Sequence, residues 1–398
     1  MGKLKVRRLK EEHGVALVLG MLLLLILTLI GISALNTSNY DILISGNEKA
    51  SVQAFYIAEA GINEFTGRFR PDATNQIPDS DPSNPNWEVL LAKYPGRGAT
   101  QIGFVSGDPN SILSLQDQLD FGVETKHKTD AGNQVVQYAG VPIYLLKSYG
   151  FTVDGGNKVL ELELKRSPDY DPPAALYSSM PVFIRGSSTY INGNDGCGTR
   201  NKPGIVTITT TIPPITETGN PTINGFPPQV TLGSNPPPMN LPIKEMIDYL
   251  RGDADFEYNY DGDRTLTGYS DDWGNPSSNG TGAPVTYVGT MHIVYFNMNG
   301  DRTLKLTGDS HGAGILLVEG NLEISGGFTW YGIILATGTV NYTGSGKANV
   351  TGGIISGGNI QMDVGIGGNL EIISCSSVSN KLRDIIPPLK ITRWREIF

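Results

Sequence analysis

The pattern of hydrophobic residues is most regular at the start of the chain. An uncharged apolar run extends from Val15 to Leu35. At about 1.5 Å per helical residue, it is long enough to cross the roughly 30 Å hydrocarbon core of a bilayer. Beyond it, apolar or small residues recur at steps of three and four, which line one face of a helix: Ala50, Ala54, Ala58, Ile62, Phe65 and Phe69. The pattern predicts one long helix over 15–69, apolar all round over 15–35 and amphipathic beyond.

The segment that precedes the apolar run is basic. Residues 1–14 form a leader with two acidic residues and five basic ones: Lys3, Lys5, Arg7, Arg8 and Lys10. The positive-inside rule therefore places the N-terminus in the cytoplasm and everything after Leu35 outside. Two other interpretations stay open, a plain signal anchor and a secretory signal. The second would be cut near Ile32-Ser33-Ala34, a poor match to an Ala-x-Ala site.

The N-terminal features together resemble the type IV pilin family, and within it the PilX-type minor pilins. The resemblance rests on the leader ending at His13-Gly14, the apolar run, Gly46-Asn47 and the block Ala54–Ile62. It implies that a prepilin peptidase cuts between Gly14 and Val15. The apolar helix then leaves the membrane for the core of a filament. The residues that we expect in this core include Leu19, Leu22, Thr28 and Gly31.

The resemblance also implies a location and a set of partners. We expect a single-pass protein of the bacterial inner membrane that is later part of an extracellular pilus, at its tip. Its partners would be other major and minor pilins, a tip adhesin, the prepilin peptidase and the inner-membrane assembly platform. Most pilins have Glu at the fifth mature position, where this chain has Leu19. A carboxylate in lipid is costly unless paired, so its loss suits a subunit with no neighbour above it.

Residues 70–168 have the pattern of a small pilin-like α/β head. A proline-rich stretch comes first, with a short helix expected over Trp87–Tyr94. Three alternating segments rich in Val, Tyr, Leu and Ile follow, which predict an antiparallel sheet: Phe121–Lys128, Val135–Tyr149 and Lys158–Lys165. Asp154-Gly155-Gly156-Asn157 is typical of a hairpin turn.

Residues 169–379 are rich in glycine and repeat one pattern. Copies begin at Gly314, Gly332 and Gly353, each with two short alternating strands around a corner, at Gly320, Gly338 and Gly358. A period near 20 residues is typical of a β-solenoid, and we expect the side chains that point inward in the first copy to be Ile315, Leu317, Leu322 and Ile324. Val182–Gly193 resembles a fourth copy, separated from the others by a proline-rich insertion, Ile212–Pro242, and an expected short helix, Pro242–Leu250. Val285–Thr307 is a candidate for another coil. The fold class is therefore α+β: a long pilin helix, a small antiparallel head and a C-terminal solenoid, with a β-sandwich as the alternative to the solenoid.

The tail, residues 380–398, alternates basic with apolar side chains. It is expected to be a strand that closes a sheet edge, or else a binding tail for a neighbouring minor pilin.

The composition of the chain points to few binding or catalytic sites. The net charge of −9 and the absence of a basic footprint apart from the tail argue against specific nucleic-acid binding. An exported chain with two cysteines favours a disulfide between Cys197 and Cys375 over two free thiols. We expect no cofactor; Asp261 and Asp263, in an acidic loop, are weak candidates for Ca²⁺, because no EF-hand spacing accompanies them.

Catalysis is not expected. Asp309, Ser310 and His311 are adjacent in sequence, but neighbours on a strand point to opposite faces and do not form a nucleophile and base pair. We therefore expect a structural minor pilin that primes assembly and displays its β-rich domain for adhesion or for contact with a tip protein. A tip pseudopilin of a type II secretion system is the alternative, and a filament-carried polysaccharide-acting enzyme, with Asp301, Arg302 and Lys305 as candidate residues, is a distant third.

Overall fold

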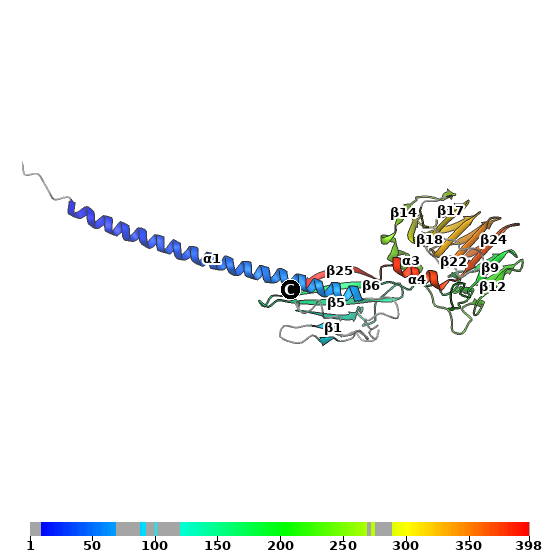
Figure 1. Ribbon diagram of the computed structural model, residues 1–398, viewed down its shortest axis with the longest axis horizontal. Coiled ribbons are helices and arrows are strands. Elements are labelled where there is room, and N and C mark those ends of the chain that lie inside the picture. Colours follow the sequence, from blue (N-terminus) through cyan, green and yellow to red (C-terminus); the bar gives the residue numbers. More distant parts are fainter. Residues whose placement is uncertain are drawn as a thin grey trace, which may run out of the picture.

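The computed structural model describes residues 9–68, 88–92, 100–101, 120–268, 272–274 and 289–397. Three parts follow one another along the long axis of the molecule: the helix α1 (Leu9–Arg68), a small head beneath its C-terminal half, and a β-solenoid beyond the head (Figure 1). The predicted α+β class is confirmed, with a parallel solenoid in place of the alternative sandwich.

The C-terminal half of α1 packs on the head through small residues. Ala54 and Ala58 are fully buried, and Ile62 and Phe65 continue the same face, so the predicted helical face is confirmed as far as Phe65; Phe69 lies outside the described residues. A Cβ atom on Gly150 would lie 2.0 Å from the carbonyl oxygen of Ala54. This close approach explains the glycine, because any side chain there would push the helix off the sheet.

The head is an antiparallel sheet with the strand order β2-β1-β3-β5-β6-β25, and β4 pairs with β5. Its strands are β1 (Glu88–Ala92), β2 (Thr100–Gln101), β3 (Asp120–His127), β4 (Gln137–Tyr138), β5 (Val141–Phe151), β6 (Asn157–Arg166) and β25 (Leu389–Ile397). The predicted helix over Trp87–Tyr94 is wrong in its described part, residues 88–92, which form β1 and pair with β3. A short apolar run fits either structure, and pairing to an available strand edge decides it.

The solenoid is inserted into the head. The chain leaves β6, builds the whole solenoid, and returns as β25 to pair with β6, with Arg166 opposite Leu389. The solenoid follows the first strands of the head, as expected, and the tail expected to close a sheet edge is β25. The last strand of the chain is part of the head sheet and forms one of its edges.

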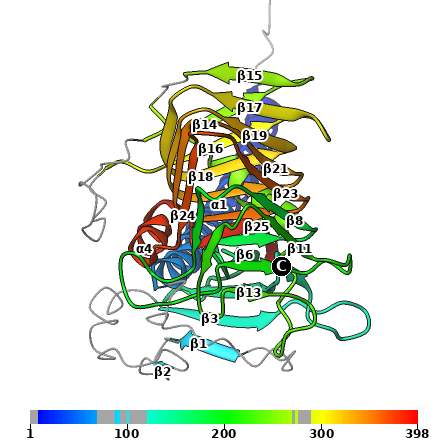
Figure 2. The same cartoon turned by 90° about the vertical axis from the view of Figure 1, so that its right-hand side faces the viewer.

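The solenoid has two parallel sheets. The helix-covered sheet has the order β12-β9-β24-β22-β20-β18-β16-β14, extended by β7, β10 and β13, and the open sheet has the order β11-β8-β23-β21-β19-β17-β15 (Figure 2). Their strands are β7 (Leu176–Ser178), β8 (Val182–Arg185), β9 (Thr189–Asn192), β10 (Ile205–Thr207), β11 (Ile215–Thr218), β12 (Thr222–Asn224), β13 (Gln229–Val230), β14 (Phe256–Asn259), β15 (Arg264–Thr267), β16 (His292–Asn297), β17 (Thr303–Thr307), β18 (Ser310–Glu319), β19 (Asn321–Ser325), β20 (Phe328–Ala336), β21 (Val340–Gly344), β22 (Lys347–Ser356), β23 (Ile360–Val364) and β24 (Asn369–Ile373).

The corners between the two sheets form a column of glycines. The amide of Gly338 donates to the carbonyl of Gly320 at 2.9 Å, and the amide of Gly358 donates to that of Gly338 at 3.0 Å. A Cβ atom on Gly358 would lie 2.6 Å from the backbone of Gly338. The predicted corners are confirmed, and glycine is needed there because neighbouring turns of the coil stack backbone on backbone.

The order of the coils differs from the order of the chain. β22 pairs through Lys347–Thr351 with β24 and through Ile354–Ser356 with β7. The late segment, Phe256–Ile373, therefore ends beside the start of the early segment, Leu176–Val230, and the two form one continuous stack. The first and last residues of the solenoid lie in the middle of this stack, at a junction that we call the seam.

The proline-rich insertion is part of the stack. Within Ile212–Pro242, β11 pairs with β8, β12 with β9 and β13 with β10. The expectation that this segment separates the coils is wrong, because β11 and β12 complete the coil that β10 begins and β13 stacks on β10. The short helix expected next is confirmed as α3 (Ile243–Leu250), which continues into the single-turn helix η2 (Arg251–Asp253).

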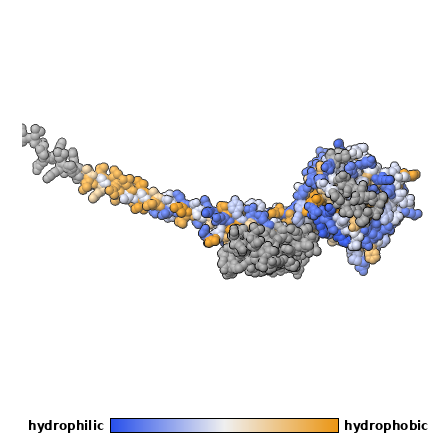
Figure 3. Space-filling model, viewed as in Figure 1, coloured by the Kyte–Doolittle hydropathy of each residue, from blue (hydrophilic) through white to orange (hydrophobic). Residues whose placement is uncertain are grey.

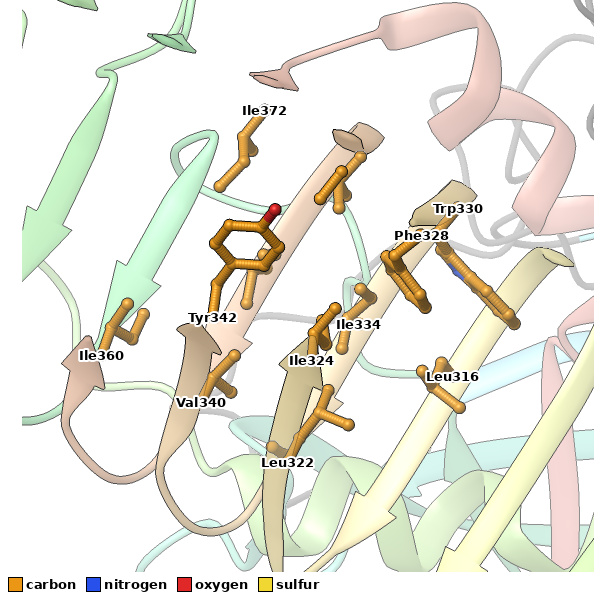
Figure 4. Close-up of a cluster of buried hydrophobic side chains, with 14 of the residues drawn as sticks. Leu316, Leu322, Ile324, Phe328, Trp330, Ile334, Val340, Tyr342, Ile360 and Ile372 are labelled. Carbon is orange, nitrogen blue, oxygen red and sulfur yellow. The ribbon is translucent and has the colours of Figure 1, made fainter. Parts of the chain in front are cut away.

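Two hydrophobic cores hold the solenoid together. The first lies between the sheets and includes Leu322, Ile324, Phe328 and Trp330 (Figure 4). The second lies on the outer face of the helix-covered sheet, under α3 and α4 (Ser376–Ile385). Ile315 and Leu317 belong to this second core and not to the interior as expected. The strand that carries them is buried on both faces, so its alternation does not reveal which face points inward.

Candidate functional site

The N-terminal half of α1 carries the residues expected in a filament core. Leu19 and Leu22 are exposed, and nothing lies within 4 Å of a Cβ built on Gly31. The Thr28 hydroxyl donates to the carbonyl of Leu25 at 2.8 Å, which satisfies this polar group within the helix. Figure 3 shows the resulting hydrophobic surface along this part of the helix. A surface of this kind needs a bilayer or other helices to cover it.

The expected cleavage position lies inside this helix. Both Gly14 and Val15 are helical, because α1 begins at Leu9. Within the described residues, one helix is long and apolar enough to cross a membrane, Val15–Asn63. Cleavage at Gly14 stays a prediction.

A single loop fastens both connections between the head and the solenoid. Residues 193–203, between β9 and β10, reach the first connection through Lys202, whose Nζ lies 2.6 Å from Asp171 Oδ1. They reach the second through the disulfide between Cys197 and Cys375, which lies between β24 and α4. The bond therefore joins the two segments of the stack at the seam.

Asp195 adds a second link across the seam. Its carboxylate accepts hydrogen bonds from the backbone amides of Cys197 at 3.1 Å, Arg200 at 3.0 Å and Ser376 at 3.0 Å. Burial alone raises the pKa of Asp195, but the hydrogen bonds from Ser376, Cys197 and Arg200 outweigh it, and the pKa is lowered overall. The ionised form of Asp195 thus stabilises the seam.

Helix α3 fastens the solenoid to the head. The Tyr249 hydroxyl donates to the carbonyl of Pro387 at 2.9 Å, and Lys390 of β25 forms an ion pair with Asp253. On the solenoid side, Lys244 Nζ lies 2.7 Å from Glu319 Oε1. Burial by itself raises the pKa of Glu319, but the hydrogen bonds from Lys244 and Tyr295 leave it lowered. These contacts hold the solenoid at the end of the head.

The weak calcium candidates are engaged in hydrogen bonds. Asp261 Oδ1 accepts from Asn299 Nδ2 at 3.3 Å, and Asp263 Oδ1 accepts from the Thr303 amide at 2.8 Å. Among the residues that the structure describes, no group of three or more His, Cys, Asp or Glu side chains is arranged to hold a metal ion. The expectation about cofactors stays a prediction.

Ser310 and His311, which are adjacent in sequence, do not form a nucleophile and base pair in this structure. The buried Ser310 hydroxyl donates to the carbonyl of Thr307 at 3.3 Å, while His311 Nδ1 lies 3.3 Å from the carbonyl of Asp309. Lys305, a candidate for polysaccharide chemistry, pairs with Glu323 at 2.5 Å.

The comparison with protein families agrees with the N-terminal geometry. Residues 13–63 match the family model described as PilX N-terminal. This match and the long, exposed apolar helix make the N-terminal part of the chain type IV pilin-like. No curated protein matches it. Among solved structures, it is similar to the competence-associated pilin ComZ from Thermus thermophilus, at 13% identity and a TM-score of 0.22, over 87% of this chain and 97% of that one.

Sequence reasoning missed one surface feature of the solenoid. A groove of about 330 Å³ lies on the outside of the open sheet, between β23, β8 and β11. It includes Phe183 and Arg185, from the segment Val182–Gly193 that the repeat pattern identified. The sequence of this segment could have indicated the groove, because alternation directs the side chain of Phe183 outward, where a polar residue is usual.

Proposed function

We propose that this protein is a tip-located minor pilin that primes assembly of a type IV pilus and displays its solenoid for attachment to surfaces. Its role is structural. Before assembly it would lie in the inner membrane with its N-terminus in the cytoplasm. There the prepilin peptidase would cut between Gly14 and Val15, and the assembly platform would then extract it into a pilus of major and minor pilins.

The position of the solenoid supports the tip location. It lies beyond the C-terminal end of α1, along the continuation of the long axis (Figure 1). If the apolar half of α1 packs in the core of a filament, a subunit in the shaft would have the next subunits in that space. The solenoid, fastened to the head by α3 and by two connections, would collide with them. A subunit at the tip has no such neighbours.

The residue at the fifth mature position supports the same location. Leu19 is apolar and exposed, so it offers no carboxylate to the N-terminal amine of a neighbouring subunit. A subunit that starts the filament needs no such partner above it. An unpaired carboxylate there would also raise the cost of holding the helix in lipid.

Two deletions separate assembly from attachment. The first removes the whole protein. The second removes residues 167–388 and joins Arg166 to Leu389 through an Asn-Gly turn, because these two residues already lie opposite each other on β6 and β25. This excision keeps every strand of the head sheet.

We expect the whole-protein deletion to lower the number of pili seen by electron microscopy. The excision should leave that number near the wild-type value and abolish attachment of cells to surfaces. An equal loss of pili in both strains would mean that the solenoid serves assembly, and the display function would be wrong.

A further inference from the structure

A groove on the outside of the open sheet has the features of a binding site. The groove of about 330 Å³ crosses β23, β8 and β11, where strand register aligns side chains in two rows. One row is Gln361, Phe183 and Thr216, and the next is Asp363, Arg185 and Thr218. In parallel strands, residues in register are about 4.8 Å apart, so the rows form a continuous polar strip with one aromatic ring in it.

The ring of Phe183 is the unusual member. It is 41% exposed and is the one large apolar side chain exposed on the described strands of the open sheet. Its strand neighbours Ile184 and Val182 are buried in the core. Alternation thus puts Phe183 where other strands of this sheet carry polar side chains, and no packing role inside the solenoid accounts for it.

The charges around the ring are balanced. Arg185 Nη1 lies 3.6 Å from Asp363 Oδ2, and farther along the sheet Lys305 is paired with Glu323. Because both groups of the first pair are exposed, each keeps free hydrogen-bonding positions toward solvent. The groove therefore offers directed donors and acceptors without an excess of either charge.

The remaining outward positions of the open sheet are largely hydroxyl or amide groups. One row of hydroxyls runs across four neighbouring strands, from Thr267 and Thr307 to Ser325 and Thr343. The hydroxyl of Thr307 donates to that of Thr267 at 2.8 Å. The row extends the groove in the direction of the solenoid axis, since Thr343 is opposite Asp363.

We propose that this groove binds a neutral oligosaccharide, with one sugar ring stacked on Phe183 and its hydroxyls bound by Arg185, Asp363 and Gln361. A pyranose has a face of C–H groups that packs on an aromatic ring, and a rim of hydroxyls that hydrogen bonds to planar amide, carboxylate and guanidinium groups. The inference rests on the proposed display function, for which it supplies the class of ligand.

The same features argue against the other ligand classes. A nucleic acid or an acidic polysaccharide needs an excess of basic side chains, which the Arg185–Asp363 pair does not provide. A protein partner usually requires a contiguous apolar anchor region, whereas Phe183 stands alone among polar groups.

The test measures binding to defined sugars with the full chain in lauryldimethylamine oxide, because glycosidic detergents would compete for the site. The probes are chitohexaose, cellohexaose and maltohexaose, compared with polygalacturonate and single-stranded DNA. We expect at least one neutral hexasaccharide to bind. Phe183→Ala should weaken that binding about tenfold, the value of an aromatic stacking contact, and Phe183→Tyr should retain it. Ile366→Ala, at a fully exposed residue outside the groove, is the matched control and should have no effect.

Several results would overturn the inference. These are binding of none of the three neutral sugars, binding that is unchanged in Phe183→Ala, and binding of only the anionic probes. The attachment assay with the solenoid excision keeps the two proposals apart. If the excision abolishes attachment while no neutral sugar binds, the ligand class is wrong and the display function stands. If sugar binds and the excision leaves attachment intact, the ligand class is right and the display function is wrong.

Discussion

Removing the disulfide at the seam should destabilise the solenoid more than any single surface change. Cys197 and Cys375 are separated by 178 residues. In the chain-entropy treatment, a crosslink over a loop of this length stabilises the folded state by at most about 5 kcal/mol. The bond also joins the loop that fastens both connections to the head. The double variant Cys197→Ala with Cys375→Ala should therefore lose a large part of the solenoid's stability.

Urea unfolding followed by tryptophan fluorescence is a suitable assay. Trp273 and Trp330 are fully buried in the core of the solenoid, whereas Trp394 of β25 is 62% exposed. With Trp87, which lies outside the described residues, replaced by Phe, a change in the emission of the buried pair reports on the solenoid. With a slope of about 2.5 kcal/mol per molar urea, a loss near the upper limit would lower the midpoint by about 2 M.

Two controls make the result interpretable. Wild-type protein treated with a reductant should show the same shift as the double variant, since both lack the bond. Ser-for-Cys replacements should behave like the alanine replacements. If all of these proteins unfold at the wild-type midpoint, the seam does not depend on the crosslink, and the reasoning about the two joined segments is wrong.

Three further predictions follow from single positions. Gly150→Ala places a Cβ within 2.0 Å of the Ala54 carbonyl oxygen and should separate α1 from the sheet, seen as faster proteolysis of the helix. Asp195→Asn should reduce the loss of stability in acid. The lowered pKa of Asp195 means that its contribution is present above the unfolded value of 3.8 and is lost as the pH falls through the folded value, so the difference in urea midpoint between pH 7 and pH 3 should shrink. Intact mass of the protein from sheared pili should correspond to a chain that begins at Val15, and a start near Leu35 would contradict the pilin interpretation.

The helix and the repeats were predictable because their signals are local. Ala54 and Ala58 repeat at the helical period, and each coil has its own corner glycine, so a short window contains the whole pattern. The side-chain alternation of β5 and β6 likewise predicts two strands without any knowledge of the rest of the fold.

The arrangement of the coils was not predictable in this way. The contact between β22 and β7 and the pairing of β25 with β6 join segments that are far apart in sequence. No local pattern encodes which coil lies next to which. Asp195 was missed for the same reason: two of its amide donors lie in its own loop, but the third, Ser376, reaches it only when the seam closes. The face of Ile315 was misassigned because α3 and α4 bury the outer side of its strand as fully as the interior.

The location of the protein on the pilus is the central claim, and direct labelling tests it. An epitope inserted between Ile366 and Gly367 would lie in the turn between β23 and β24, where Ile366 is fully exposed and a Cβ on Gly367 would meet nothing within 4 Å. Immunogold electron microscopy of sheared pili should then show gold at one end of the filaments. Gold distributed along the shaft would contradict the account.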